Sequence, residues 1–154
     1  MSLIKQGRYF FMTFLTNSEE QTIALARQIA KRLKAGDVVL LQGDLGAGKT
    51  HFVKGIAQGL GIDKEVTSPT FALHNSYQTK DFSLNHFDFY RIDNVEDALQ
   101  LGLAEFFGRE DSVCFVEWAQ NVAPLIPENA KKITITRLND NVREIEIDNA
   151  LLDD

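Results

Sequence analysis

Apolar and polar positions along the chain follow two different periods, which predict alternating strands and helices. Residues Arg8 to Leu15 alternate with a period of two, as a strand with one buried face does. The segment Ile23 to Leu33 places apolar residues three and four apart, which is the period of an amphipathic helix. A capping box, Ser18-Glu-Glu-Gln21, precedes this segment, and Gly36 follows it as a C-terminal glycine. The chain therefore begins with a strand that leads into one helix.

Two short apolar runs have no polar face and predict strands that are covered on both sides. They are Val38–Leu41 and Val113–Val116, which are too short for helices. Strands of this kind form the parallel centre of an α/β sheet, and ligands bind at the carboxyl ends of such strands. A glycine-rich loop follows the first run and Glu117 follows the second, so both lie where a ligand is expected.

The rest of the pattern predicts two more helices and two hairpins. Together with the elements above, they give an α/β fold: a single P-loop NTPase-like domain over residues 1–154, with residues 1–9 peripheral to it. Its central sheet is expected to be mixed, mostly parallel and flanked by helices, with a C-terminal β-hairpin. The predicted helices are Thr50–Leu60 and Val95–Phe107, and Asp93 is expected to cap the second. The first predicted hairpin pairs Phe71–Tyr77 with Phe82–Tyr90, and the second pairs Ile133–Leu138 with Val142–Ile147.

Composition and charge fit one cytoplasmic domain of ordinary size. The 154 residues carry 22 acidic and 16 basic side chains, for a net charge of −6. No basic run is longer than Lys131-Lys132, so a stand-alone nucleic-acid binder, which needs a concentrated basic face, is not expected. No apolar run approaches the roughly 20 residues of a membrane helix, and no export signal is expected at the N-terminus. The single cysteine, Cys114, lies in an apolar run and is expected to be a buried hydrophobe.

One loop carries the strongest chemical signal in the chain. Residues 43–50, GDLGAGKT, match the phosphate-binding pattern G-x-x-x-x-G-K-[ST] in full, between a predicted buried strand and a predicted helix. Glycines let successive N–H groups turn inward as an anion-binding nest, and the helix N-terminus adds its own free N–H groups. Lys49 supplies a mobile charge for the outer phosphates, and the Thr50 hydroxyl is expected to ligate Mg²⁺. The expected nucleotide-binding residues of this loop are Gly43, Asp44, Leu45, Gly46, Ala47, Gly48, Lys49 and Thr50.

Two acidic residues are candidates for holding the metal and directing the attacking water. Hydrolysis at such a loop needs Mg²⁺ held from a second side and a group that orients water. Glu117 ends a hydrophobic strand where Asp is more usual, so its role as metal ligand or water-orienting base is open. Asp88 lies in HFDFYR, where alternation places it on the face of His86 and Tyr90; a solvent-facing strand edge is the other interpretation. We expect Lys49, Asp88 and Glu117 to be catalytic, and Thr50, Glu117 and Asp88 to hold the metal.

Four further residues each have a functional and a structural interpretation. The Thr70 hydroxyl, in the segment Thr67–Thr70, suits a Mg²⁺-bound water or the terminal phosphate, although the segment also has ordinary loop composition. His86 is expected to be a core or edge imidazole. Trp118 serves either packing or a ligand platform, and Arg137 either stacks on a purine or faces solvent. We retain Thr70, Trp118 and Arg137 among the expected nucleotide-binding residues.

Four motifs, taken in their order along the chain, resemble the TsaE (YjeE) family: GDLGAGKTHF, TSPTF, HFDFYRI and VEW. The resemblance spans roughly residues 17–118, continues more weakly through the final hairpin, and does not include the stretch before Phe10. It implies a P-loop ATPase of the bacterial machinery that makes threonylcarbamoyladenosine in tRNA, with Mg²⁺ as cofactor, ATP as substrate and ADP as product. By position, it implies that Lys49 and Thr50 belong to the Walker A loop and that Glu117-Trp118 is the Walker B end. It also implies that Thr67–Thr70 is a switch segment and that Asp88 is the acidic switch residue.

The resemblance also implies partners. The family works in the cytoplasm with two partner proteins of the threonylcarbamoyl transferase complex, and hydrolysis resets that complex so that it turns over repeatedly. Such a chain meets tRNA only indirectly, through those partners, which agrees with its acidic charge. Two other functions remain open from the residues: a small-molecule kinase that uses the same loop, and a nucleotide-sensing module that does not hydrolyse. A GTPase is not expected, because no N-K-x-D segment occurs in the chain.

Overall fold

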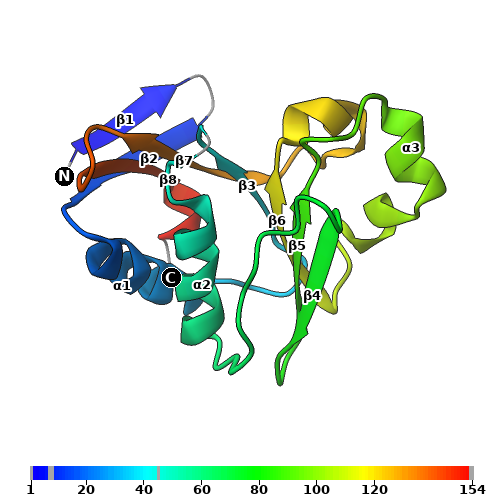
Figure 1. The fold of residues 1–154 in the computed structure, drawn as a ribbon, viewed down its shortest axis with the longest axis horizontal. Coiled ribbons are helices and arrows are strands. Elements are labelled where there is room, and N and C mark those ends of the chain that lie inside the picture. The colour runs from blue at the N-terminus through cyan, green and yellow to red at the C-terminus, as the bar shows by residue number, and fades with distance from the viewer. Residues whose placement is uncertain (1, 7–8, 45, 153–154) are drawn as a thin grey trace. The chain divides into compact units, whose positions relative to one another are not determined.

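The computed structural model describes residues 2–6, 9–44 and 46–152, and the chain groups into two compact units. The first unit holds Met1–Leu33, Leu41–Val66 and Lys131–Asp154, and the second holds Lys34–Leu40 and Thr67–Ala130. Each unit combines helices with strands (Figure 1). The predicted α/β class is therefore confirmed, while the assignment of residues 1–154 to a single domain stays a prediction.

The sheet of the first unit is antiparallel, with strand order β1-β2-β8-β7. β1 (Ser2–Gln6) pairs with β2 (Tyr9–Thr16), and β7 (Lys131–Arg137) pairs with β8 (Arg143–Asp148). The second pair is the predicted C-terminal hairpin, which is confirmed. Alternate positions of this hairpin are buried because they face the core of the unit, and these are Ile133, Ile135, Ile145 and Ile147.

Two helices of the first unit, α1 (Glu19–Ala30) and α2 (Lys49–Gly59), lie side by side (Figure 1). The predicted cap at Ser18 is confirmed, but the reciprocal bond of Gln21 goes to Asn17 and not to Ser18 as in a standard capping box. The Ser18 hydroxyl accepts a hydrogen bond of 3.1 Å from the backbone N–H of Gln21, and the Gln21 side chain accepts one of 2.7 Å from the N–H of Asn17. These bonds satisfy donors that have no acceptor within the helix, so they fix where α1 begins.

The sheet of the second unit is parallel in its centre. β6 (Ser112–Glu117) pairs in parallel with β3 (Val38–Gln42) on one side and with β5 (Ser83–Asp88) on the other. β4 (His74–Gln78) adds an antiparallel edge to β5. Every residue of β6 is buried, which confirms the prediction that the second apolar run is covered on both faces. β3 begins in the second unit and ends in the first.

The strand predicted over Phe71–Tyr77 begins later than expected, at His74. The backbone N–H of Leu73 donates a hydrogen bond of 2.6 Å to the Pro69 carbonyl, and Leu73 has a φ of 68°. Residues in a closed turn cannot pair with a neighbouring strand, so Phe71 is 82 % exposed instead of lying in the sheet. The strand prediction is wrong for residues 71–73. Their apolar side chains suggest a strand, but the proline before them starts a turn.

The helix predicted over Val95–Phe107 is also interrupted. Its first part forms α3 (Val95–Gln100), and a 3₁₀ segment, η1 (Leu103–Phe106), follows Gly102. Gly102 has a φ of 71°, a left-handed conformation that ends a helix. The cap is Asn94 rather than the predicted Asp93, since the Asn94 side chain accepts a hydrogen bond of 3.1 Å from the N–H of Asp97. None of the described helices is long and apolar enough to cross a membrane.

Candidate functional site

The glycine loop ends directly in the N-terminus of α2. Gly48 precedes the helix with a φ of 106°, which an L side chain rarely adopts, and its carbonyl accepts a hydrogen bond of 3.0 Å from the N–H of Phe52. Lys49 and Thr50 therefore occupy the first turn, where backbone N–H groups have no acceptor within the helix and the helix dipole is positive. This is the setting in which a phosphate group binds a helix N-terminus.

The beginning of the loop is held close to β7. A Cβ atom on Gly43 would lie 2.6 Å from the carbonyl oxygen of Ile135, so only glycine fits this approach. Within the loop, the N–H of Ala47 donates a hydrogen bond of 3.0 Å to the Asp44 carbonyl. Leu45, one of the expected nucleotide-binding residues, lies outside the described residues. The two outer glycines of the motif therefore serve distinct steric needs: close packing at its start and a left-handed turn at its end.

Arg143 is a residue of this site that the sequence pattern did not reveal. Its Nε donates a hydrogen bond of 2.9 Å to the carbonyl of Ala47, and its Nη1 donates one of 2.7 Å to the carbonyl of Asn139. The guanidinium thus joins the glycine loop to the turn of the C-terminal hairpin. The sequence offered no signal for this contact, because Arg143 is an ordinary polar position of an alternating strand and its partner lies 96 positions away.

Two hollows of the first unit flank the loop. One has a volume of about 250 Å³ and is bounded by Gly48 and His51 at the start of α2; the other, of about 430 Å³, is bounded by Gly43 and Arg137. Arg137 thus lies beside the loop, where its side chain is about half exposed and forms an ion pair of 2.5 Å with Asp140. The remaining residues around the first hollow are Ser18, Glu19, Glu20, Thr22, Asp140, Asn141 and Arg143.

The two expected acids of the second unit, Asp88 and Glu117, are neighbours. They end the adjacent parallel strands β5 and β6 and lie opposite each other in the register of the pair. Each is only 4 % exposed, so neither is a solvent-facing residue at a strand edge. Two buried carboxylates at the carboxyl ends of parallel strands form a place where a cation would be stabilised.

The Asp88 carboxylate is held by two hydrogen bonds. Its Oδ2 accepts a bond of 2.7 Å from the Thr70 hydroxyl, and its Oδ1 accepts one of 2.9 Å from the backbone N–H of Tyr90. The Ser68 hydroxyl lies 2.8 Å from that of Thr70. The Thr67–Thr70 segment is therefore connected to the end of β5 through the carboxylate that the sequence motifs single out.

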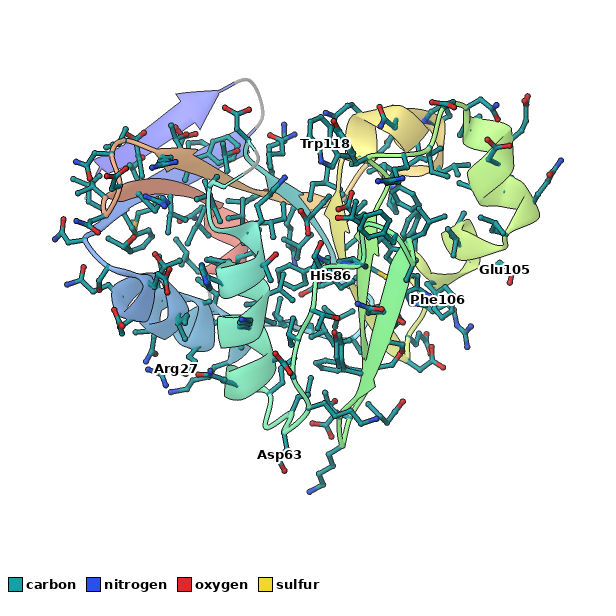
Figure 2. All side chains as sticks on the ribbon, viewed as in Figure 1. Arg27, Asp63, His86, Glu105, Phe106 and Trp118 are labelled. Atoms are coloured by element: carbon teal, nitrogen blue, oxygen red, sulfur yellow. The ribbon has the colours of Figure 1, made fainter. Side chains whose placement is uncertain are left out.

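The Glu117 carboxylate has a buried imidazole as a neighbour. Nε2 of His86 lies 2.5 Å from Oε2 of Glu117, and His86 is fully buried. His86 lies on β5 (Figure 2). Of the two expected settings for His86, core or edge, the structure shows the core, and no sequence signal indicated the contact with Glu117. Trp118 follows with a φ of 56°, which is uncommon for a residue other than glycine, and its ring lies 4.9 Å from that of Tyr90. Trp118 is partly buried against the core of this unit.

The expected metal donors suit Mg²⁺ in their chemistry. They are one hydroxyl, Thr50, and two carboxylates, Asp88 and Glu117, and Mg²⁺ prefers oxygen ligands of this kind. In the described part of the chain, no three His, Cys, Asp or Glu side chains converge as a metal-binding cluster. Mg²⁺ that binds together with a nucleotide usually takes one or two carboxylates, with phosphates and waters as its other ligands. The hydroxyl of the first unit and the two carboxylates of the second are therefore each, by their own chemistry, suitable ligands for the ion.

Two side chains of the second unit have shifted pKa values, and neither is an expected site residue. Burial lowers the pKa of His74, with a smaller opposing effect from its hydrogen bond to Asn85 and a further lowering by the nearby His86. Burial raises the pKa of the Cys114 thiol to about 11. Cys114 is fully buried in β6, which confirms the expectation that it is a small buried hydrophobe.

These features define a class of protein. A full phosphate-binding motif joins a buried strand to a helix N-terminus within an α/β fold, and this arrangement is typical of P-loop nucleotide-binding proteins. The sequence model of one family, described as "Threonylcarbamoyl adenosine biosynthesis protein TsaE", matches residues 16–145. The chain belongs to the TsaE family.

Several relatives are similar over most of their length. The tRNA threonylcarbamoyladenosine biosynthesis protein TsaE of Bacillus subtilis is 44 % identical over 130 residues, which cover 84 % of this chain and 80 % of that protein. The protein of the same name from Treponema pallidum is 41 % identical over 137 residues, covering 88 % and 99 %. A crystal structure of Bacillus subtilis YdiB matches with a TM-score of 0.78 and 37 % identity, covering 93 % of this chain and 88 % of that one.

Proposed function

We propose that this chain binds and hydrolyses ATP as the TsaE component of tRNA threonylcarbamoyladenosine synthesis. The observation that carries the proposal is the loop that Gly48 closes, with Lys49 and Thr50 in the first turn of α2. A loop of this form binds the phosphates of a nucleotide. ATP is the proposed substrate and ADP the proposed product.

Each site residue has a role in this proposal. Lys49 neutralises the outer phosphates, and Thr50 ligates Mg²⁺, which, when bound, offsets the charge that develops during phosphoryl transfer. Asp88 and Glu117 supply carboxylates that ligate the ion or orient the attacking water, and both are buried at strand ends. The hydroxyl of Thr70 holds Asp88.

The nucleoside part of ATP is proposed to occupy a hollow beside the loop. Arg137 borders the hollow that includes Gly43, and its planar guanidinium suits stacking on a purine base. Trp118 offers an indole as a platform for the nucleotide. The remaining expected contacts are backbone groups of the loop, from Gly43, Asp44, Leu45, Gly46, Ala47 and Gly48.

The proposed physiological action is on a partner complex. The relatives are named for tRNA threonylcarbamoyladenosine biosynthesis, and we propose that this chain permits repeated turnover by two partner proteins of the threonylcarbamoyl transferase complex. We further propose that it acts in the cytoplasm, that it is slow alone, and that it meets tRNA only through these partners. An acidic chain with a net charge of −6 is suited to such indirect contact.

The fate of the γ-phosphate of labelled ATP tests the proposed chemistry. With Mg²⁺ and the partner proteins, the label is expected in inorganic phosphate, and no other acceptor should be needed. Label that appears only in a small added acceptor would make the chain a kinase. Label that stays in tightly bound ATP would make it a nucleotide-sensing module. Either of these two results contradicts the proposal.

A further inference from the structure

His86 is a buried imidazole that the proposed function does not yet use. Its Nε2 lies 2.5 Å from Oε2 of Glu117, whereas Nδ1 has no hydrogen-bond partner among the described residues. A polar ring nitrogen that is buried without a partner costs free energy. A leucine would fill the position without this cost, so packing alone does not explain an imidazole here. The contact with Glu117 does.

The pairing register of β5 and β6 places His86 within reach of Glu117. His86 lies opposite Phe115 and Asp88 lies opposite Glu117. Residues two apart on a strand share a face, so His86, Asp88 and Glu117 all point to one side of the sheet. His86 lies two residues before Asp88 on β5, so its side chain reaches Glu117 diagonally across the pair of strands. Asp88 has its own donors, the Thr70 hydroxyl and a backbone N–H, and His86 is a donor for Glu117.

The hydrogen-bonding capacity of the His86 ring and the Glu117 carboxylate shows which atom carries the proton that they share. A carboxylate oxygen only accepts hydrogen bonds, so the bond requires the proton to be on Nε2 of His86. A second proton on Nδ1 would be a buried donor with no acceptor among the described residues. The contact is therefore a hydrogen bond in which the Nε2–H of His86 donates to Oε2 of Glu117.

We infer that His86 is a positioning residue whose Nε2–H fixes the orientation of the Glu117 carboxylate. The inference rests on the proposed function for what Glu117 does, namely to ligate Mg²⁺ or orient the attacking water. The hydrogen bond itself does not depend on that function. Groups that orient a metal-binding side chain typically change affinity or activity about 10- to 100-fold when they are replaced. His86 acts through Glu117 and is not assigned a contact with the nucleotide.

Nuclear magnetic resonance of the ¹⁵N-labelled chain without nucleotide tests the hydrogen bond. Long-range ¹H–¹⁵N correlation spectra identify the tautomer of each of the three histidines, and His86→Gln assigns the signals of His86. We expect a His86 ring with its proton on Nε2 and protected from exchange with water, and we expect Glu117→Ala to remove that protection. A proton on Nδ1, or protection that Glu117→Ala leaves unchanged, would overturn the inference.

Kinetics test whether the hydrogen bond matters for turnover. His86→Leu is expected to lower kcat at least about tenfold with little change in nucleotide affinity, and His86→Gln, which keeps an amide donor, should retain more activity. In a Glu117→Ala background, His86→Leu should cause no further loss, because the group it positions is gone. His74→Leu is the matched control: His74 is also an imidazole on this sheet, and it bonds Asn85 instead of Glu117.

The outcomes separate this inference from the proposed function. If His86→Leu lowers kcat by the same factor in the wild-type and Glu117→Ala backgrounds, His86 does not act through Glu117 and the inference is wrong. If His86→Leu does not fold, His86→Gln with the same double-variant comparison decides the question. If the wild-type chain releases no phosphate even with its partners, the proposed function fails, and the magnetic resonance result alone decides whether His86 holds Glu117.

Discussion

The Thr70 hydroxyl donates a hydrogen bond of 2.7 Å to Oδ2 of Asp88. This bond connects the segment Thr67–Thr70 to the end of β5, and the other oxygen of Asp88 is fixed by the backbone N–H of Tyr90. Both oxygens of the carboxylate are therefore oriented by the protein before any ligand arrives. Preorganised groups of this kind reduce the reorganisation that catalysis would otherwise require.

Thr70→Val removes this donor while keeping the shape of the side chain. We expect a loss of stability of about 1 kcal/mol, the usual worth of one hydrogen bond, and a decrease in ATP turnover because Asp88 loses its orientation. Steady-state phosphate release and thermal unfolding would measure the two effects. Thr67→Val is the matched control, since Thr67 lies in the same segment and its hydroxyl contacts Asn75. Equal turnover by Thr70→Val and Thr67→Val would contradict the role assigned to the bond.

Lys49→Ala and Glu117→Ala should separate nucleotide binding from chemistry. Lys49→Ala is expected to weaken nucleotide binding as well as turnover, because the lysine charge faces the phosphates before and during the reaction. Glu117→Ala is expected to reduce turnover more than affinity, by about a hundredfold or about 3 kcal/mol, as for the loss of one catalytic electrostatic contact. Calorimetric titration with ADP and measurement of kcat distinguish the two. Glu117→Ala turnover at the wild-type rate would remove Glu117 from the catalytic set.

The contact between α1 and α2 should not tolerate a methyl group at Gly55. A Cβ atom there would lie 2.6 Å from both the Cβ of Ala26 and the carbonyl oxygen of Ile23. Gly55→Ala is therefore expected to lower the free energy of unfolding by about 1–3 kcal/mol, as overpacking usually does, although alanine favours helices. Urea unfolding measures the change. Gln58→Ala, at an exposed position of α2 that makes only a long hydrogen bond of 3.5 Å with Arg27 of α1, is the control and should stay within about 0.5 kcal/mol of wild type. A more stable Gly55→Ala chain would contradict this packing.

His74 should make stability depend on pH. Burial lowers the pKa of His74 in the folded chain, whereas an unfolded histidine has a pKa near about 6.5. Its neutral ring therefore contributes stability that is fully present above about pH 6.5 and is lost as the pH falls toward the lower folded-state pKa, because the unfolded chain binds more protons.

A comparison with His74→Gln isolates this effect from that of the other titrating groups. The difference in the free energy of unfolding between wild type and variant is expected to shrink as the pH falls from 7.5 to 5.5. Urea unfolding at several pH values measures it. A difference that stays constant or grows toward low pH would mean that the folded chain binds the proton at least as well as the unfolded chain does.

The parts of the site that lie within one contiguous segment were predictable from the sequence. The glycine loop could be identified because one tight turn and one helix N-terminus fix the spacing of its glycines. In the structure, Gly43 packs closely against β7 and Gly48 has a left-handed backbone directly before α2. The buried strand before Glu117 was likewise predictable, since a short run without a polar face has no exposed side. For the same reason the α/β class followed from the alternation of such runs with helical segments.

Contacts between distant segments could not be predicted in this way. The pairs Thr70–Asp88, His86–Glu117 and Arg143–Ala47 are separated by 18, 31 and 96 positions. Their formation depends on strand register and on how a hairpin meets a loop, and a periodic pattern fixes neither. The break at Gly102 shows a related limit: the apolar spacing of a helix continued past a residue whose left-handed backbone ended it.

Phosphate release from Mg-ATP, with and without the two partner proteins, tests the central claim most directly. Lys49→Ala serves as the inactive control because Lys49 belongs to the phosphate-binding motif and lies in the first turn of α2. We predict slow release by the chain alone, faster release with the assembled partners, and loss of this acceleration in Lys49→Ala. Release that the partners do not accelerate, or that Lys49→Ala sustains at the wild-type rate, would contradict the account.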